Sequence, residues 1–147
     1  MKRSELLAFL RAQKWACEAS VSVHGAPQAA AIGIAITEEL EIVFDTFDDS
    51  RKAENLRRNP KIALVVGWDN GVTIQIEGTT DEPQGDERDR LRAAYFERFP
   101  DGEARAAAGN VAYFRVRPSW IRVSDFRTRE AVVTMFDLSE VSAVQSP

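Results

Sequence analysis

The dipeptide Asn70-Gly71 lies between two runs of β-type residues and constrains the fold more than any other short signal in the sequence. Asn-Gly favours a tight hairpin turn because both residues tolerate positive φ. The run before it, Lys61–Val66, is apolar on both faces and predicts a buried strand. The run after it, Val72–Thr79, alternates apolar and polar residues and predicts a strand with one face toward the core. The chain is therefore expected to contain an antiparallel hairpin here.

Similar runs occur on both sides of this hairpin. Further strands are predicted at Trp15–Val23, Gln28–Thr37, Leu40–Phe44, Val111–Arg117, Ser119–Phe126 and, as a short addition, Val132–Phe136, with Pro118 interrupting the last long pair. Helices are predicted at Ser4–Lys14, with Ser4 as its cap, at Lys52–Arg58 and at Asp86–Phe99. Six to seven antiparallel strands at this spacing favour a mainly β fold with flanking helices, a sandwich or barrel rather than βαβ units.

The composition is that of a soluble globular domain, with 44% apolar and 29% charged residues among 147. We expect one domain over residues 1–136 and a C-terminal tail, residues 137–147, that buries little and frays. A net charge of −4 argues against nucleic acid or an anionic membrane as the main partner. No apolar run is long enough to span a bilayer, and Met1-Lys2-Arg3 leads into an acid-containing amphipathic segment, so a cytoplasmic protein is expected.

One cysteine and one histidine leave little material for a metal site or a nucleophile pair. Cys17 lies in a predicted strand and is expected to be a small buried residue. His24 lies in the turn before Gly25, where a role as a base has little support. No metal site is predicted, and no catalytic residue is identified.

The polar segment from Asp45 to Lys52 joins a predicted strand to a predicted helix. Ser50 is placed to cap that helix, which on local sequence alone is the commoner role of such a residue. The alternative is an anion site. Free backbone N–H groups at a helix N-terminus favour negative charge, and Arg51 and Lys52 would add two cations that suit phosphate oxygens.

Two strand faces could lie beside a ligand. The face formed by Ala29, Ala31, Gly33 and Ala35 is flat enough to accept a planar ring or another subunit's sheet, although a tightly packed core face explains it equally well. The polar row Thr73, Gln75 and Glu77 either faces solvent or lines a site.

Three segments in order resemble the pyridoxamine 5′-phosphate oxidase-like family of FMN-binding split-barrel proteins. They are Phe44-Asp-Thr-Phe-Asp-Asp-Ser-Arg-Lys52, Asn59-Pro60-Lys-Ile-Ala-Leu64 and Ile74-Gln-Ile-Glu-Gly78. They follow a leading helix and a strand that ends in His24-Gly-Ala-Pro27, and the resemblance covers about Ser4 to Asp125. The resemblance implies an obligate-type homodimer of split β-barrels with FMN at the subunit interface. It also implies these cofactor-binding residues: Asp45 and Thr46 at the flavin, Arg51 and Lys52 at its phosphate with Ser50 assisting, and Thr73 or Gln75 as a polar contact.

The sequence departs from the true oxidases in the substrate half of the site. The resemblance places their two strand cations at Ala30 and Ala35, and the arginine and serine that follow the substrate tyrosine, here Tyr95, at Phe99 and Glu103. Pyridoxamine phosphate oxidase activity itself is therefore not expected. The function predicted is an FMN-binding flavoprotein, an oxidoreductase of unknown substrate. The alternatives are a non-catalytic flavin-binding or stress-response module, an F420- or haem-binding relative, and a structural dimer with an empty site, which the missing cation at Ala30 leaves open.

Overall fold

One antiparallel sheet of eight strands organises residues 1–138, the part of the chain that this computed structural model describes. The strands are β1 (Trp15–Val21), β2 (Pro27–Gly33), β3 (Ala35–Ile36), β4 (Ile42–Phe47), β5 (Lys61–Val66), β6 (Val72–Asp81), β7 (Val111–Asp125) and β8 (Val132–Asp137). The helices are α1 (Arg3–Ala12), α2 (Arg51–Arg58), α3 (Gly85–Arg98) and α4 (Gly102–Ala108). Of the tail predicted to fray, Asp137 belongs to β8, and residues 139–147 lie outside the described residues.

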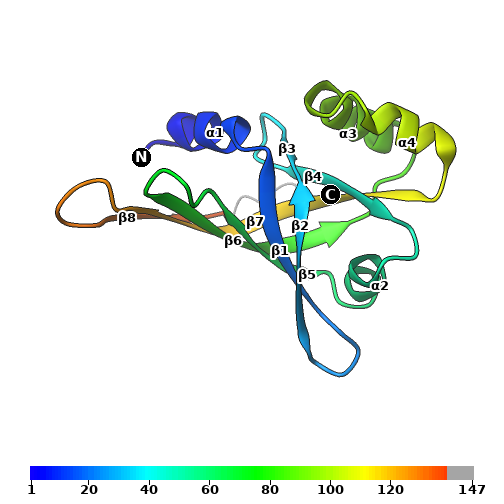
Figure 1. Ribbon diagram of the computed structural model, residues 1–147, viewed down its shortest axis with the longest axis horizontal. Coiled ribbons are helices and arrows are strands. Elements are labelled where there is room, and N and C mark those ends of the chain that lie inside the picture. Colours follow the sequence, from blue (N-terminus) through cyan, green and yellow to red (C-terminus); the bar gives the residue numbers. More distant parts are fainter. Residues whose placement is uncertain (139–147) are drawn as a thin grey trace.

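The sheet curls because its two ends belong to one stretch of chain. The strand order is β2-β1-β5-β6-β7-β4-β3. Two strands share β7: β4 pairs with its first part, Val111–Val116, and β8 pairs with its last part, Trp120–Asp125. β2 and β3 stand at opposite ends of this order, yet only Ile34 separates them along the chain. Figure 1 shows β2 running into β3, which lies beside β4. The predicted antiparallel, mainly β split-barrel fold with flanking helices is confirmed.

The segment Gln28–Thr37, predicted as one strand, is divided at Ile34. The amide of Ile34 still donates to the carbonyl of Lys14 at 3.0 Å, one residue beyond the last β1–β2 pair, and Ala35 then pairs with Val43 of β4. The small-residue face is divided in the same way. Ala29 and Ala31 are exposed, whereas Ala35 is buried beneath a helix.

Pro118 does not interrupt the sheet, as the sequence suggested it would. β7 runs through it for 15 residues. Glu77 pairs with Trp120 and Gly78 pairs with Pro118, so Ser119 is the extra residue of a β-bulge. A bulge tolerates a proline because the local ladder is already disrupted there.

Three further expectations about local structure are wrong. The interpretation of Lys61–Val66 as buried on both faces fails, because Ala63 and Val65 are exposed. Cys17 is also exposed rather than buried. Helix α1 begins at Arg3 with Lys2 as its N-cap, so Ser4 is not the cap. In the two strand cases the local pattern correctly indicated a strand, but the cover over each face depends on distant segments. In the helix the prediction was wrong about where α1 begins and which residue caps it.

The core has two parts on opposite sides of β4. Inside the curled sheet, Leu6 and Leu10 of α1 pack with inward side chains of the strands, among them Ile42 and Phe44. The second part lies under α3, which Figure 1 shows beside β3 and β4, and consists of Ala35, Val43, Leu91, Tyr95, Phe99 and Tyr113. Successive side chains of a strand point to opposite faces. Thr46 therefore points inward with Phe44, and Asp45 points outward with Val43.

Candidate functional site

Helix α2 lies against one end of the barrel and is held there by a buried amide. The side-chain nitrogen of Asn55 donates to Ser20 Oγ at 3.1 Å and to Gln28 Oε1 at 2.9 Å. Asn55 is buried, and these two partners belong to β1 and to β2. A buried polar side chain with two partners fixes the helix in one position.

The start of α2 has features of both roles predicted for the Asp45–Lys52 segment, the helix cap and the anion site. Ser50 is the N-cap, and its Oγ accepts from the amide of Ala53 at 3.2 Å, as predicted. Ser50 Oγ also lies 2.9 Å from Thr46 Oγ1, and Lys52 Nζ donates to Thr46 Oγ1 at 3.3 Å. Thr46 is not in a turn, because β4 continues to Phe47. Strand and helix thus hold one half-buried ammonium group at the mouth of a pocket.

The pocket beside this ammonium group has a volume of about 160 Å³. Its lining comes from β1, β2 and α2 and consists of Glu18, Ser20, Gln28, Ala29, Ala30, Arg51 and Lys52. Arg51 is exposed and makes no hydrogen bond or ion pair with any residue in 1–138. A pocket of this size with two cations at a helix N-terminus suits a phosphate group. Ala30, where the resemblance places an arginine, leaves that space open.

Glu18 is the residue of this pocket that sequence reasoning missed. Its side chain points inward from β1 and is 1% exposed, and its Oε2 is buried without a hydrogen-bond partner. Burial raises the pKa of this carboxyl, and the charge of Lys52 and a hydrogen bond from Ser20 offset only part of that effect. In the sequence, the alternation of Ala16, Glu18 and Ser20 puts these three side chains on one face of a strand. It does not show that this face is buried.

Asp45 does not point its carboxylate into this pocket. Its Oδ1 accepts from Tyr95 Oη at 2.9 Å, and its Oδ2 accepts from Arg105 Nε at 3.2 Å. Burial, followed by the charge of Asp45 and the hydrogen bond to it, raises the pKa of Tyr95. The backbone of Asp45 still adjoins Thr46, so a contact of Asp45 with a ligand in the pocket would use its main chain.

Thr73 and Gln75 lie on the outer face of the barrel, away from the pocket in the same chain. Gln75 pairs with Val65, Val65 pairs with Cys17, and Cys17 pairs with Ala31. Directly paired residues share a face, so these four side chains form one exposed band. We call the exposed residues Cys17, Ala29, Ala31, Ala63, Val65 and Gln75 the outer face. Glu18 follows Cys17 in the strand and therefore points to the other side.

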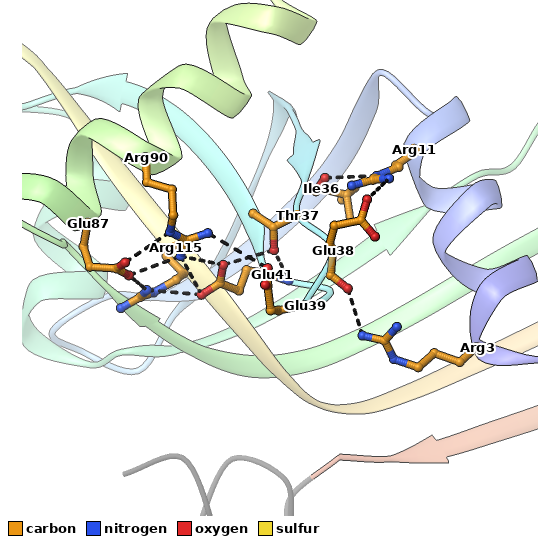
Figure 2. Close-up of polar contacts among 10 residues, drawn as sticks. All are labelled: Arg3, Arg11, Ile36, Thr37, Glu38, Glu39, Glu41, Glu87, Arg90 and Arg115. Atoms are coloured by element: carbon orange, nitrogen blue, oxygen red, sulfur yellow. Dashed lines mark hydrogen bonds and ion pairs between the residues drawn. The ribbon is translucent and has the colours of Figure 1, made fainter. Parts of the chain in front are cut away.

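A second polar cluster lies at α3, away from the pocket. Figure 2 shows Arg115 of β7 between Glu87 and Glu41, with Arg90 of α3 reaching the same two carboxylates. Arg115 also forms an ion pair with Asp81 at 2.6 Å, and its side chain is 6% exposed. These contacts join α3 to the sheet, and each charge has an opposite partner.

A larger groove of about 750 Å³ lies between α1, β3 and α3. Its charged lining balances three arginines against three glutamates, namely Arg11, Arg90, Arg98, Glu38, Glu39 and Glu97. Arg11 and Arg90 are already in ion pairs with glutamates. The charges that line the groove therefore sum to zero, whereas the smaller pocket at α2 has two cations, Arg51 and Lys52, and one acid, Glu18.

Among the described residues, few are suited to a metal site or to a site built on histidine. Within residues 1–138, no group of three His, Cys, Asp or Glu side chains is placed to hold a metal ion. His24 lies in the exposed turn between β1 and β2. None of the helices in this part of the chain has the length and apolar character needed to cross a membrane.

A protein-family comparison agrees with this fold. The family model described as Pyridoxamine 5'-phosphate oxidase, PNPOx_N, matches residues 3–125. The chain belongs to this family. The match includes β1 to β7 and helices α1 to α4, and so contains the whole pocket at α2. No curated protein matches this chain by sequence.

Solved structures extend the comparison. The heme binding protein from Mycobacterium smegmatis is similar with a TM-score of 0.80 at 16% identity, over 98% of this chain and 61% of that chain. A pyridoxamine 5'-phosphate oxidase-related, FMN binding protein from Nostoc punctiforme has a TM-score of 0.69 at 16% identity, over 92% and 84%. HutZ, a heme storage protein from Vibrio cholerae, has a TM-score of 0.70 at 18% identity, over 93% and 97%.

The TM-scores establish a shared fold, and identities of 16–18% establish nothing beyond it. This family member spans less than two thirds of the Mycobacterium smegmatis protein. Among its structural relatives are a protein that binds FMN and proteins that bind or store haem.

Proposed function

We propose that this chain is an FMN-binding flavoprotein and that the pocket at α2 receives the FMN phosphate. The observation that carries the proposal is the convergence of Arg51, Lys52 and the capped N-terminus of α2 on one pocket. Of the two cations, Arg51 has no partner among the described residues, so its guanidinium is available to a ligand. Charge-assisted hydrogen bonds of this kind are among the stronger polar contacts in proteins.

The proposal includes a homodimer packed through the outer face. Apolar side chains such as Val65, which is 39% exposed, and Ala31 are exposed there beside Gln75. A contiguous exposed apolar surface on a sheet is typical of a protein interface. Because Gln75 and the pocket lie on opposite sides of the sheet in one chain, a second copy is the simplest way for both to meet one cofactor. In this arrangement, Thr73 and Gln75 would be polar contacts to the flavin ring.

We propose oxidoreductase activity with an unknown substrate. Bound FMN supplies electron or hydride transfer, and the protein supplies position and electrostatics. The residues of this chain would then anchor the phosphate and orient the ring without a catalytic acid or base of their own. Oxidation of pyridoxamine phosphate is not part of the proposal, because Ala35, Phe99 and Glu103 offer no cation or hydroxyl for a second phosphate.

FMN is favoured over haem by the chemistry of the side chains present. Haem iron requires an axial ligand such as histidine, and the single histidine, His24, lies in the exposed turn between β1 and β2 and does not line the pocket. A larger deazaflavin such as F420 would bring more negative charge than Arg51 and Lys52 can balance.

The test is an FMN titration followed by flavin fluorescence. Wild-type protein is expected to quench the flavin and to show its visible absorption bands. The double variant Arg51→Ala plus Lys52→Ala should weaken binding at least about tenfold, since each charge-assisted contact contributes roughly 1.5–3 kcal/mol. The variants Asp86→Asn and Arg98→Ala change exposed charges on α3 and should bind like wild type. Equal affinity in the double variant would contradict the phosphate assignment. A Soret band with added haem and no flavin binding would replace FMN with haem.

A further inference from the structure

The pocket at α2 contains a buried carboxylic acid, Glu18, in addition to the two cations that would hold a phosphate. We propose that Glu18 is a specificity-determining residue of this pocket. In the complex, Glu18 and the bound phosphate share one proton, so the pocket binds a phosphomonoester only when that proton is present. The inference rests on the proposed function, because it concerns the same pocket. It adds a requirement on the protonation of the ligand that the two cations alone would not impose.

The geometry places Glu18 at the inner wall of the pocket. On β1 it lies opposite Ala30 of β2 and Leu64 of β5, so neither neighbouring strand offers its side chain a polar partner. Ser20 and Gln28 both accept hydrogen bonds from Asn55, and the Ser20 hydroxyl is left to donate to the Glu18 carboxyl. Glu18 Oε2 is one of three buried side-chain atoms without a partner among residues 1–138. Such an atom marks a place where a ligand can complete the hydrogen bonding.

The charges that face Glu18 come from one element. Lys52 and Arg51 of α2 line the pocket, and Lys52 already donates to Thr46. The side chains of β1 and β2 in the lining, Ser20, Gln28, Ala29 and Ala30, are neutral. Arg58 of α2 donates to Asn55 and is not part of the lining. Two cations therefore face one acid before any ligand enters.

The chemistry follows from the sum of these charges. An ionised Glu18 beside a phosphate dianion would place three negative charges against two cations, with one of the three, on Glu18, shielded from solvent. A protonated carboxyl instead donates an O–H···O hydrogen bond to a phosphate oxygen, and the proton comes from solvent. Because the second pKa of a phosphomonoester is about 6, the dianion predominates above neutral pH. Binding there must take up a proton, carried by either Glu18 or the phosphate. The empty position at Ala30 matters because an arginine there would add a third cation and remove this requirement.

The experiment measures FMN and riboflavin binding between pH 6 and pH 9 for wild type and Glu18→Gln. In wild type the FMN dissociation constant is expected to rise by up to about tenfold per pH unit above pH 7, the limit for uptake of one proton. Glu18→Gln keeps a donor of the same size, so its FMN affinity should be nearly constant and at least about tenfold tighter than wild type at pH 8.5. Riboflavin lacks the phosphate and should show no such dependence in either protein.

Calorimetry in two buffers of different ionisation enthalpy gives an independent readout. Wild type should take up about one proton per FMN at pH 8, and Glu18→Gln close to none. Glu54→Gln is the matched control, because it removes an exposed carboxylate from the first turn of the same helix outside the pocket. It should keep the wild-type pH profile. Thermal unfolding checks that each variant is folded.

The two proposals fail in different ways. FMN binding with the same pH dependence and proton uptake in wild type and Glu18→Gln would overturn the role of Glu18 and leave the flavoprotein proposal intact. Absence of FMN binding by both proteins at every pH would overturn the proposed function and this inference with it. Binding by Glu18→Gln at high pH where wild type does not bind would support both.

Discussion

The hydroxyl of Tyr95 donates a 2.9 Å hydrogen bond to Oδ1 of Asp45, a residue 50 positions earlier in the chain. Arg105 of α4 holds the other oxygen of the same carboxylate at 3.2 Å. These contacts attach α3 and α4 to the outer side of β4. On its inner side, the next residue, Thr46, holds Lys52 at the pocket. Two consecutive residues of β4 therefore have different roles. Asp45 attaches α3 and α4 to the sheet, and Thr46 positions Lys52 at the candidate anion site.

The Tyr95 hydroxyl is expected to stabilise the fold. Tyr95→Phe removes a hydrogen bond to a partly buried charged group and should lower the free energy of unfolding by about 1.5 kcal/mol. Urea denaturation measures this change. Tyr113→Phe is the matched control, because Tyr113 lies in the same apolar cluster and its hydroxyl is buried without a hydrogen-bond partner. It should change stability by no more than about 0.5 kcal/mol. Equal losses in both variants would show that ring packing, not the bond to Asp45, accounts for the effect.

Glu87 makes stability depend on pH on the acid side. Hydrogen bonds from Arg90 and then Arg115 lower its pKa from 4.5 to about 2. A lowered pKa in the folded state means that its contribution is fully present above pH 4.5 and is lost as the pH falls toward 2. Glu87→Gln should be less stable than wild type at pH 7, with a difference that shrinks between pH 4.5 and pH 2. Denaturation at a series of pH values measures it.

The control for this pH effect is Glu103→Gln, which removes an exposed carboxylate of α4 that has no ion pair within the described chain. It should follow the wild-type curve. A Glu87→Gln difference that stays constant down to pH 2 would contradict the assigned pairing.

Gly78 is required by the bulge in β7. A Cβ at this position would overlap the carbonyl oxygen of Arg117, which belongs to the backbone and cannot move aside without breaking the strand pair. Gly78→Ala should therefore lower the free energy of unfolding by roughly 1–3 kcal/mol, as overpacking does. Gly85→Ala is the comparison, because Gly85 has φ +63° but open space around it. It should cost about 1 kcal/mol, the penalty for a left-handed backbone. A smaller loss at Gly78 than at Gly85 would show that the bulge relaxes.

Much of the architecture could be predicted because its signals are local. The antiparallel hairpin predicted at Asn70-Gly71 joins β5 to β6, although residues 67–71 connect the strands and Gly71, not Asn70, has positive φ. The alternation of Val72, Ile74 and Ile76 puts all three in the core. Ser50 caps α2, because capping involves only residues three positions apart. The pairing of Glu18 with Ala30 could not be predicted in this way, because it depends on a strand register that no local pattern specifies.

By itself, the sequence determined where most of the strands lie, the capped helix and the place of two cations at its start, but not the division at Ile34 or the continuity of β7 through Pro118. Alternation with period two also determined which side chains share a face. Only the tertiary structure decided what covers each face. It buried Glu18 under α2, left Cys17 and Val65 exposed, and turned the carboxylate of Asp45 toward Tyr95. The physical reason is that burial depends on contacts between segments far apart in the chain, whereas turns, caps and alternation depend on neighbours a few residues away.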